Sequence, residues 1–273
     1  MSKKSTSPIK WVGGKTRLLH ELQSRLPPIV ETYFEPFCGG AALFFSSNFT
    51  NSHLNDFNSE LINFYEVLSS SCEALIDLVL GWSIDEKFYY ELRGWDRSSD
   101  YVDRTDLERA ARFLYLNRTC FNGLWRMNAK HGYNNTPWGR PKKVDFQLEK
   151  LRAASIKLGT ASLSSVDFEV AVKGAEEGDF VYFDPPYIPI SKTSSFTGYT
   201  VDGFGDADQV RLRDCCDRLN EKNIKWMLSN SSSPRVFELY SGYTVEIVSI
   251  KRLIGGKGSV RSSINEVIVR NYA

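Results

Sequence analysis

The residues best suited to chemistry are Asp184-Pro185-Pro186-Tyr187, which follow an apolar run at 179–183. That run favours a strand, and open α/β sheets bind ligands at the carboxyl ends of their strands. Proline fixes φ and lacks an N–H donor, so the carbonyls of Asp184 and Pro185 are rigid acceptors. An acid and a carbonyl match the two donors of an exocyclic amino group, and a purine stacked on Tyr187 gains about 1–3 kcal/mol. The motif predicts an adenine pocket, although a capped proline turn explains these four residues alone.

A second candidate site is the glycine turn at 35–40, Glu-Pro-Phe-Cys-Gly-Gly, between a short strand and a helix. Glycines let a ligand approach the backbone, and the start of a helix favours negative charge. The turn lacks the G-x-G-x-x-G spacing of dinucleotide sites, and Gly13-Gly14-Lys15 lacks the upstream glycine of a phosphate-binding loop. Asp56 follows the next strand about 20 residues on, where an acid can accept both ribose hydroxyls. The pattern predicts a nucleotide-like cofactor, while capping of a helix near Ser59 explains Asp56 equally well.

Other side chains are suited to completing this cofactor site. Trp11 can pack on the cofactor and Lys15 can pair with a carboxylate, although an apolar anchor and a solvated lysine explain them too. Asp167 and Phe168 follow a third strand and can present a carboxylate and a ring to an adenine. A surface turn is the alternative for that pair.

Composition restricts the class of protein. With 273 residues, 42% hydrophobic, 25% charged and a net charge of +1, the chain can bury one core with or without a small insertion. No apolar run approaches the roughly 20 residues that span a bilayer, and the polar N-terminus lacks a signal-peptide stretch. The five cysteines form no C-x-x-C pair, which argues against a disulfide framework and a zinc site. We therefore expect an intracellular protein without a metal.

The order of apolar and polar runs predicts a mostly parallel α/β sheet with an antiparallel edge. The expected strands are 33–37, a run ending at 54–56, 163–166, 179–183, 226–229 and a hairpin of 243–251 with 263–270. Helical periodicity is seen at 18–26, 43–45, 60–68, 73–82 and 206–219. Residues 84–145 alternate charged and aromatic side chains and contain two expected helices, 87–93 and 106–116. The domain prediction is a catalytic domain of 1–82 and 151–273 with a helical insertion at 83–150.

A basic, aromatic segment follows the second helix of this insertion, beginning with residues 117–126. Basic side chains suit phosphates, arginine and asparagine are the geometry-favoured partners of guanine and adenine, and Phe121 can wedge into a base stack. A solvated basic loop with aromatic packing is the alternative. The loop carries Lys130, His131, Arg140, Lys142 and Lys143 with Tyr133 and Trp138 interleaved.

Together these motifs resemble the Dam-type, D12 class adenine-N6 DNA methyltransferases, and the match is closest to GATC-specific methylases of restriction systems. The resemblance covers 9–272 in the motif order of that group. Lys10-Trp11-x-Gly-Gly-Lys15 resembles its N-terminal cofactor motif, 34–40 its cofactor loop and 184–187 its catalytic motif. Ala41 departs from the third glycine that is frequent there, and its small Cβ predicts little harm.

The resemblance implies a Rossmann-like S-adenosylmethionine-dependent methyltransferase sheet with a helical target-recognition insertion. It implies that the target adenine is flipped from the duplex, that Asp184 and the Pro185 carbonyl accept its amino hydrogens, and that Tyr187 stacks on it. The methyl group then moves in one in-line step without a covalent enzyme intermediate. The implied catalytic residues are Asp184, Pro185, Pro186 and Tyr187, and the implied cofactor residues are Trp11, Lys15, Phe37, Gly39, Asp56, Asp167, Phe168 and Asp184.

The resemblance also implies how the DNA is read. Lys10 contacts the first guanine of GATC, and phenylalanine replaces the frequent tyrosine at Phe121, which keeps stacking but loses a hydroxyl. The implied partners are double-stranded DNA and a cognate restriction endonuclease, with no membrane, and the implied protein is a cytoplasmic monomer of prokaryotic or phage origin. The full set of implied DNA-binding residues is Lys10, Phe121, Asn122, Leu124, Arg126, Pro137 and Arg140.

Two alternatives of different kinds stay open at this point. One is methylation of another planar nitrogen, such as cytosine N4, RNA adenine or a glutamine amide. Asp184 weighs against it, because cytosine-N4 enzymes usually have serine there and glutamine methylases asparagine. The other is a non-catalytic DNA-binding protein with the same fold, since function resides in sites rather than folds. The intact motif at 184–187 weighs against that reading.

Overall fold

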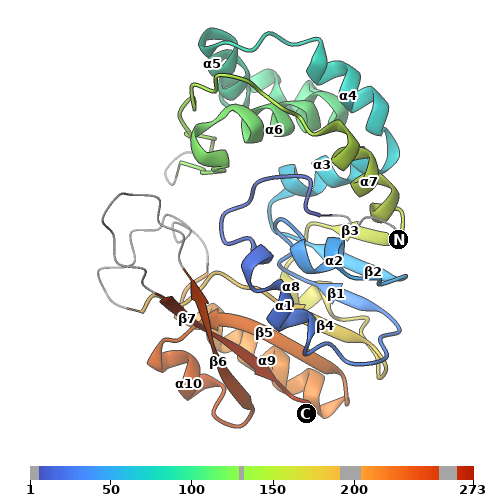
Figure 1. The fold of residues 1–273 in the computed structure, drawn as a ribbon, viewed down its shortest axis with the longest axis vertical. Coiled ribbons are helices and arrows are strands. Elements are labelled where there is room, and N and C mark those ends of the chain that lie inside the picture. Colours follow the sequence, from blue (N-terminus) through green and yellow to red (C-terminus); the bar gives the residue numbers. More distant parts are fainter. Residues whose placement is uncertain (1–5, 129–131, 191–203, 252–262) are drawn as a thin grey trace. The chain divides into compact units, whose positions relative to one another are not determined.

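The computed structural model describes residues 6–128, 132–190, 204–251 and 263–273. In these ranges the chain is mixed α/β, and its seven strands form a mostly parallel sheet with antiparallel strands at one edge (Figure 1). This confirms the predicted fold class. The chain divides into two compact units, Met1–Gly14 with Cys38–Asp167 and Lys15–Phe37 with Phe168–Ala273.

The first unit combines a pair of parallel strands with a group of helices. Strand β2 (Ser52–Asn55) pairs in parallel with β3 (Ala161–Ser164), from Ser52 opposite Ala161 to Asn55 opposite Ser164. Helix α6 packs against α3, α4 and α5, and its residues from Ala110 to Thr119 are all buried. The helices of this unit are α2 (Ala42–Ser46), α3 (Ser59–Ser70), α4 (Cys72–Leu80), α5 (Glu86–Gly94), α6 (Asp106–Thr119) and α7 (Leu148–Leu158), with short 3₁₀ turns at Trp95–Arg97, Ser99–Asp103 and Phe121–Gly123.

Side-chain caps explain where these helices begin. The side chain of Asn58 accepts a hydrogen bond from the Leu61 amide at the start of α3. At the start of α6, Thr105 and Glu108 form a reciprocal capping box. Each cap satisfies backbone N–H groups that the first turn leaves without partners, an effect worth about 1 kcal/mol.

The second unit has five strands in the order β1-β4-β5-β7-β6. Strands β1 (Tyr33–Glu35), β4 (Phe180–Phe183) and β5 (Lys225–Ser231) run parallel. Strand β7 (Ser263–Arg270) is antiparallel to β5, and β6 (Thr244–Lys251) completes a hairpin with β7. The helical segments of this unit are a 3₁₀ turn η1 (Lys15–Arg17), α1 (Leu19–Gln23), α8 (Phe168–Ala171), α9 (Asp206–Glu221), which lies along β5 in Figure 1, and α10 (Pro234–Leu239).

Strand β4 lies at the centre of the core of the second unit. Its four residues are all buried, as expected for a parallel strand that is covered on both faces. Phe34, Trp226 and Leu228 from its neighbouring strands pack into the same cluster, together with Leu212 and Cys216 of α9. The chain leaves this core at Phe183, so the next residue, Asp184, emerges at the carboxyl end of the strand.

Most expected elements lie within a few residues of their predicted bounds. The third strand lies two residues earlier than predicted, at Ala161–Ser164 (β3) rather than 163–166. The reason is that the Asn55 side chain bonds both the N–H and the C=O of Val166, which takes that residue out of the sheet. Helices α7, α8 and α10 were not predicted. Across the described ranges, no helix is long and apolar enough to cross a membrane. The predicted boundaries of the insertion stay a prediction.

Candidate active site and nucleic-acid interface

Asp184 is held by two side chains of the second unit. Its Oδ1 lies 2.7 Å from the ammonium of Lys15 and accepts a hydrogen bond of 3.0 Å from the Ser229 hydroxyl. Because Ser229 donates its one proton to Asp184, the buried Tyr182 hydroxyl must donate to Ser229, at 2.8 Å. The carboxylate is therefore fixed from η1 and from the neighbouring strand β5.

Opposing influences act on the pKa of the Asp184 carboxyl group. Burial raises the pKa of Asp184 above its ordinary value, and the Glu266 carboxylate adds to the rise. The Lys15 ammonium and the Ser229 hydroxyl act in the other direction, because both stabilise the charged form. Lys15 thus favours the ionised form of Asp184, against the effect of burial.

Tyr187 is fixed by its hydroxyl and by one face of its ring. The hydroxyl donates a 2.6 Å hydrogen bond to Oε2 of Glu266 on β7. The Lys15 ammonium lies 4.5 Å from the ring centre, within the range of a cation–π contact. Burial, followed by the charges of Asp184 and Glu266, raises the pKa of Tyr187 well above its ordinary value, so the hydroxyl keeps the proton it donates.

The glycine turn and Asp56 meet in the first unit. The Gly39 amide donates to Oδ2 of Asp56 at 2.9 Å, and the Asn58 amide donates to Oδ1 at 2.9 Å. The hydroxyl of the buried Tyr65 donates to the Gly39 carbonyl at 2.8 Å. The alternative in which Asp56 caps the following helix is wrong, because the N-cap of α3 is Asn58. Asp56 instead ties the glycine turn to the end of β2.

The indole of Trp11 lies on this glycine turn. A Cβ at Gly39 would come within 2.6 Å of the Trp11 Nε1, and one at Gly40 within 3.1 Å of the Trp11 Cβ. Gly39 also has φ +45°, a conformation that favours glycine. Ala41, where the resemblance expects a further glycine, has φ +47°. The expectation of little harm considered only the size of its Cβ, whereas a left-handed backbone at a residue other than glycine costs about 1–2 kcal/mol.

Phe37 and Phe168 belong to an aromatic cluster of the second unit. Their ring centres lie 5.4 Å apart, and Phe204 contacts Phe37 edge-on at 5.3 Å. Phe168 is only 5% exposed, so a surface turn does not describe it. Asp167 directly precedes it in the chain. These two phenylalanines are placed to support a site by packing.

Phe57 was not singled out from the sequence. It follows Asp56 directly and is 83% exposed, which is unusual for so large an apolar side chain. The sequence pattern that could have indicated Phe57 is an aromatic residue directly after the acid at the end of a strand. Ser229 and Glu266 were also missed, although a polar run ending β5 was visible in the sequence.

Lys10 and the turn at Phe121–Gly123 come together in the first unit. The side chain of the buried Asn117 accepts from the Lys10 amide at 3.0 Å and donates to the Lys10 carbonyl at 2.7 Å. A Cβ at Gly123, whose φ is +67°, would come within 2.5 Å of the Lys10 side chain. Lys10 therefore lies against the turn that carries Asn122, although more than a hundred positions separate them in the sequence.

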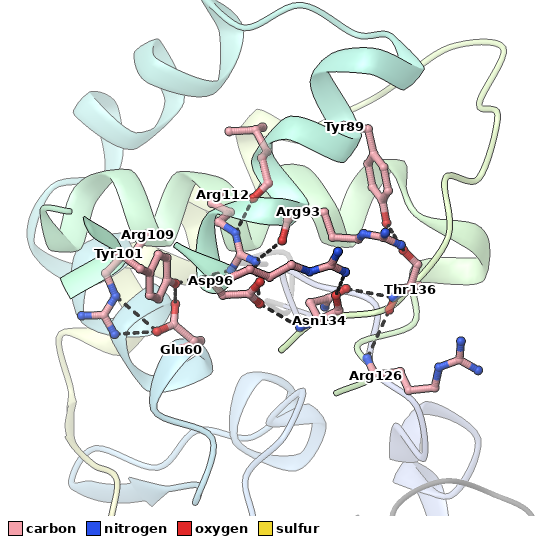
Figure 2. Close-up of polar contacts among 12 residues, drawn as sticks. Glu60, Tyr89, Arg93, Asp96, Tyr101, Arg109, Arg112, Arg126, Asn134 and Thr136 are labelled. Carbon is pink, nitrogen blue, oxygen red and sulfur yellow. Dashed lines mark hydrogen bonds and ion pairs between the residues drawn. The ribbon is translucent and has the colours of Figure 1, made fainter. Parts of the chain in front are cut away.

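Arg126 is held by the segment that follows it in the loop (Figure 2). Its Nε donates to Oδ1 of Asn135 at 2.7 Å, and its amide donates to the Thr136 hydroxyl at 3.2 Å. The Asn135 amide returns a bond to the Arg126 carbonyl at 3.0 Å. The Thr136 carbonyl in turn accepts from Tyr89 and Arg93, at 2.8 and 3.0 Å. The hydrogen-bonded segment at Asn135 and Thr136 thus supports the exposed Arg126.

A buried ion pair supports the segment that carries Asn134 and Thr136, as Figure 2 also shows. The guanidinium of Arg112, with 1% of its side chain exposed, lies 2.8 Å from the Asp96 carboxylate. Arg112 also donates to the backbone carbonyls of Leu92 and Arg93, and Asp96 accepts from the Asn134 amide at 2.7 Å. Removing one partner of such a pair costs about 3–5 kcal/mol, because the other charge is then buried without compensation.

The remaining predicted DNA-binding residues lie in the same unit. Phe121 is 51% exposed, and its amide donates to the Pro137 carbonyl at 3.0 Å, which brings these two positions together. Asn122 and Arg140 are exposed and have φ of 56° and 51°, and Leu124 is half-buried. Lys130 and His131 lie outside the described residues. An exposed ring beside exposed polar groups suits contact with bases.

Comparison with known proteins shows the family of this chain. A family model described as the D12 class N6 adenine-specific DNA methyltransferase matches residues 11–254. The chain belongs to this family. It is therefore an adenine-specific DNA methyltransferase. The family favours methyl transfer to adenine in DNA over the two alternatives, methylation of another nitrogen and a non-catalytic protein.

Three relatives of this D12 class methyltransferase align along almost their whole length. Type II methyltransferase M1.LlaDCHI of Lactococcus lactis subsp. cremoris is 46% identical over 96% of this chain and 94% of its own. Type II methyltransferase M.MjaIII of Methanocaldococcus jannaschii is 37% identical over 97% and 98%. A DNA adenine methylase of Vibrio cholerae serotype O1 is 33% identical over 97% and 96%.

The family implies S-adenosylmethionine as the methyl donor, and the donor set of the first unit fits such a group. Asp56 offers a carboxylate whose orientation two backbone amides fix, and Phe57 offers an exposed ring beside it. A ribose diol and an adenine require those two kinds of side chain. Among the described residues, no group of three or more His, Cys, Asp or Glu side chains is placed to hold a metal ion.

Proposed function

We propose that this D12 class methyltransferase methylates the adenine of GATC in duplex DNA, after the base is flipped out of the helix. The observation that supports this most is the contact between Lys10 and the turn at Phe121–Gly123. Both resemble the segments that read GATC in related methylases. Their proximity in one unit supports a single reading surface for one short site.

On this surface we assign the base contacts by chemistry. Lys10 and Arg126 face guanines, because a lysine or arginine matches the O6 and N7 acceptors of guanine. Asn122 contacts an adenine, and the exposed ring of Phe121 fills the space that the flipped base leaves. Leu124, Pro137 and Arg140 complete the reader, the last through the DNA backbone. We propose residues 83–150 as the target-recognition insertion, with 1–82 and 151–273 as the catalytic domain.

The catalytic motif then receives the flipped adenine. Asp184 and the Pro185 carbonyl accept the two amino hydrogens, which increases the electron density on the nitrogen. The ring of Tyr187 stacks on the base and Pro186 keeps the turn rigid. Bound S-adenosylmethionine supplies the methyl group. Alignment is the main contribution of the protein, with electrostatic stabilisation as positive charge develops on the nitrogen.

The cofactor is held by side chains from both motif regions. Asp56 accepts the ribose hydroxyls, and Trp11 and Gly39 form the turn beside it. To the residues expected from the sequence we add Phe57, whose exposed ring suits the cofactor adenine. The remaining cofactor residues are Lys15, Phe37, Asp167, Phe168 and Asp184. The protein acts as a monomer. It works beside a cognate restriction endonuclease, which the Type II names of two relatives support.

A labelled-donor assay tests the proposal. Purified protein is mixed with labelled S-adenosylmethionine and either a GATC duplex or the same duplex with that site scrambled. We expect N6-methyladenine in the first duplex alone, and none with Asp184→Ala, whose folding is checked by its melting temperature and its affinity for the GATC duplex. Label in both duplexes would overturn GATC and keep the chemistry. Near-native activity of Asp184→Ala would overturn the catalytic assignment.

A further inference from the structure

Buried amide side chains hold the backbone just after the catalytic aspartate. Gln209 of α9 is 3% exposed, and its Nε2 donates to the Pro186 carbonyl at 2.8 Å. Asn230 of β5 is fully buried, and its Oδ1 accepts from the Ile188 amide at 3.0 Å. The Ser231 hydroxyl donates to the Ile188 carbonyl. Helix α9 and strand β5, which contribute no reacting atom, therefore hold the backbone at Pro186 and Ile188.

The two amides also bond each other. Nδ2 of Asn230 donates to Oε1 of Gln209 at 3.5 Å, and Oδ1 of Asn230 accepts a second bond from the Ser231 amide at 2.8 Å. Burying an amide costs free energy unless its hydrogen bonds are satisfied, and even then a packed apolar pair would serve a core as well. The polar pair is better explained by the backbone groups that it holds.

The conformation of the motif shows what these bonds control. The proline rings fix φ at Pro185 and Pro186, so only rotations about ψ decide where the carbonyls point. Gln209 fixes the peptide after Pro186, and Asn230 fixes the amide of Ile188. On the other side, Ser229 fixes the carboxylate of Asp184.

The Pro185 carbonyl lies between these fixed points. Among the described residues, no donor to this carbonyl is found, whereas the carbonyls of Pro186 and Ile188 are both occupied. Within the same ranges, Lys15 and Ser229 both contact Oδ1 of Asp184, which leaves Oδ2 for another donor. The motif therefore presents two acceptors in fixed directions.

We propose that Gln209 and Asn230 are positioning residues for methyl transfer, which aim the Pro185 carbonyl and the Asp184 carboxylate at the amino group of the substrate. This inference rests on the proposed function of the motif at 184–187. Neither amide touches substrate or cofactor. Their loss misaligns the acceptors, and a displacement of about 1 Å costs up to about a hundred-fold in rate.

The test measures rate and binding separately in Gln209→Met and Asn230→Ala. We expect kcat on the GATC duplex to fall between about ten- and a hundred-fold, with KM for DNA and for S-adenosylmethionine within about two-fold of wild type. The double variant should be little worse than the worse single one, because both side chains hold one segment. Ser233→Ala is the matched control, since Ser233 is also buried and near Asn230 but bonds no part of the motif in the described chain. Its kcat should stay at the wild-type value.

Folding is controlled by assaying all proteins at one temperature, at least ten degrees below the lowest melting temperature of the set, with rates divided by the concentration of cofactor-binding sites. A variant that only loses stability then shows wild-type kcat per site, and this result would overturn the inference. A rise in KM with unchanged kcat would overturn it too. If the wild-type protein itself failed to methylate the GATC duplex, the proposed function would fail, a result distinct from full rates in the variants.

Discussion

The ammonium of Lys15 lies 2.7 Å from Oδ1 of Asp184. The same ammonium lies 4.5 Å from the ring centre of Tyr187. One cation at the start of η1 thus contacts both Asp184 and Tyr187 of the proposed catalytic motif. The N-terminal motif and the catalytic motif are separated widely in sequence, yet they meet in the second unit through this residue.

The first prediction concerns pH. Burial raises the pKa of Asp184, and in the proposed mechanism the ionised acid is the acceptor, so methylation should fall with decreasing pH at a midpoint above that of an exposed aspartate. Lys15→Met removes the cation that favours the ionised form, while Ser229, Tyr182 and Glu266 stay in place. The pKa then rises further and the acidic midpoint moves to higher pH.

The measurement for this prediction is the single-turnover rate as a function of pH on a GATC duplex. Lys15→Arg is the matched control, because it keeps the positive charge and should keep the midpoint nearer to the wild-type value. An unchanged midpoint in Lys15→Met would show that Lys15 does not set the ionisation of Asp184.

The second prediction concerns the 2.6 Å hydrogen bond from Tyr187 to Glu266. Tyr187→Phe and Glu266→Ala should each lower kcat/KM by about ten-fold, because a hydrogen bond to a charged group is worth about 1.5–3 kcal/mol. The double variant should be no worse than the worse single variant, since both remove one interaction. A double-mutant cycle measures this coupling.

The control for that cycle is Glu246→Ala. Glu246 lies on the partner strand of the same hairpin and pairs with Arg25 and Arg270, without contact to the motif in the described residues. It should lower the melting temperature and leave kcat/KM unchanged. Full additivity of the Tyr187 and Glu266 substitutions would argue that this hydrogen bond has no catalytic importance.

The third prediction concerns the glycine turn. Gly39→Ala places a Cβ within 2.6 Å of the Trp11 indole at φ +45°, so it should displace Trp11 and strain the backbone. We expect the Kd for S-adenosylmethionine, measured by calorimetry, to rise at least about ten-fold, in line with about 1–3 kcal/mol of strain. Gly94→Ala is the control, because nothing lies within 4 Å of a Cβ there. Equal affinities of the two variants would contradict this account.

The fourth prediction concerns selection of the DNA site. Arg126→Ala should relax discrimination at one base pair by about 1–3 kcal/mol. Asn135→Ala should relax it at the same base pair by a smaller amount, because Asn135 only holds the Arg126 side chain. Relative kcat/KM values on duplexes with each single substitution of GATC measure both effects. The control is Arg104→Ala, which loses contacts to Asp100 and Glu108 and should leave selectivity unchanged. Relaxation at a different base pair in the Asn135 variant would contradict the role of Asn135 in holding Arg126.

Local patterns determined much of this protein. The apolar run before Asp184 and the prolines after it place an acid at a strand end, because chain stiffness and strand preference are properties of neighbouring residues. The glycine turn before α2 follows from the same kind of evidence, and its order relative to the motif at 184–187 indicated the family that the comparison confirmed.

Tertiary structure decided which residues support these motifs. Ser229 and Glu266 reach Asp184 and Tyr187 because β5 and β7 pair in one particular register. Asp56 binds the glycine turn rather than capping α3, and Lys10 rests on a turn beyond α6. Such contacts join residues far apart in the chain, and they depend on how whole elements pack rather than on any local pattern. The sequence alone therefore predicted the groups proposed to react and Lys15 as a partner for a carboxylate, while packing added Ser229 and Glu266 as the groups that orient them.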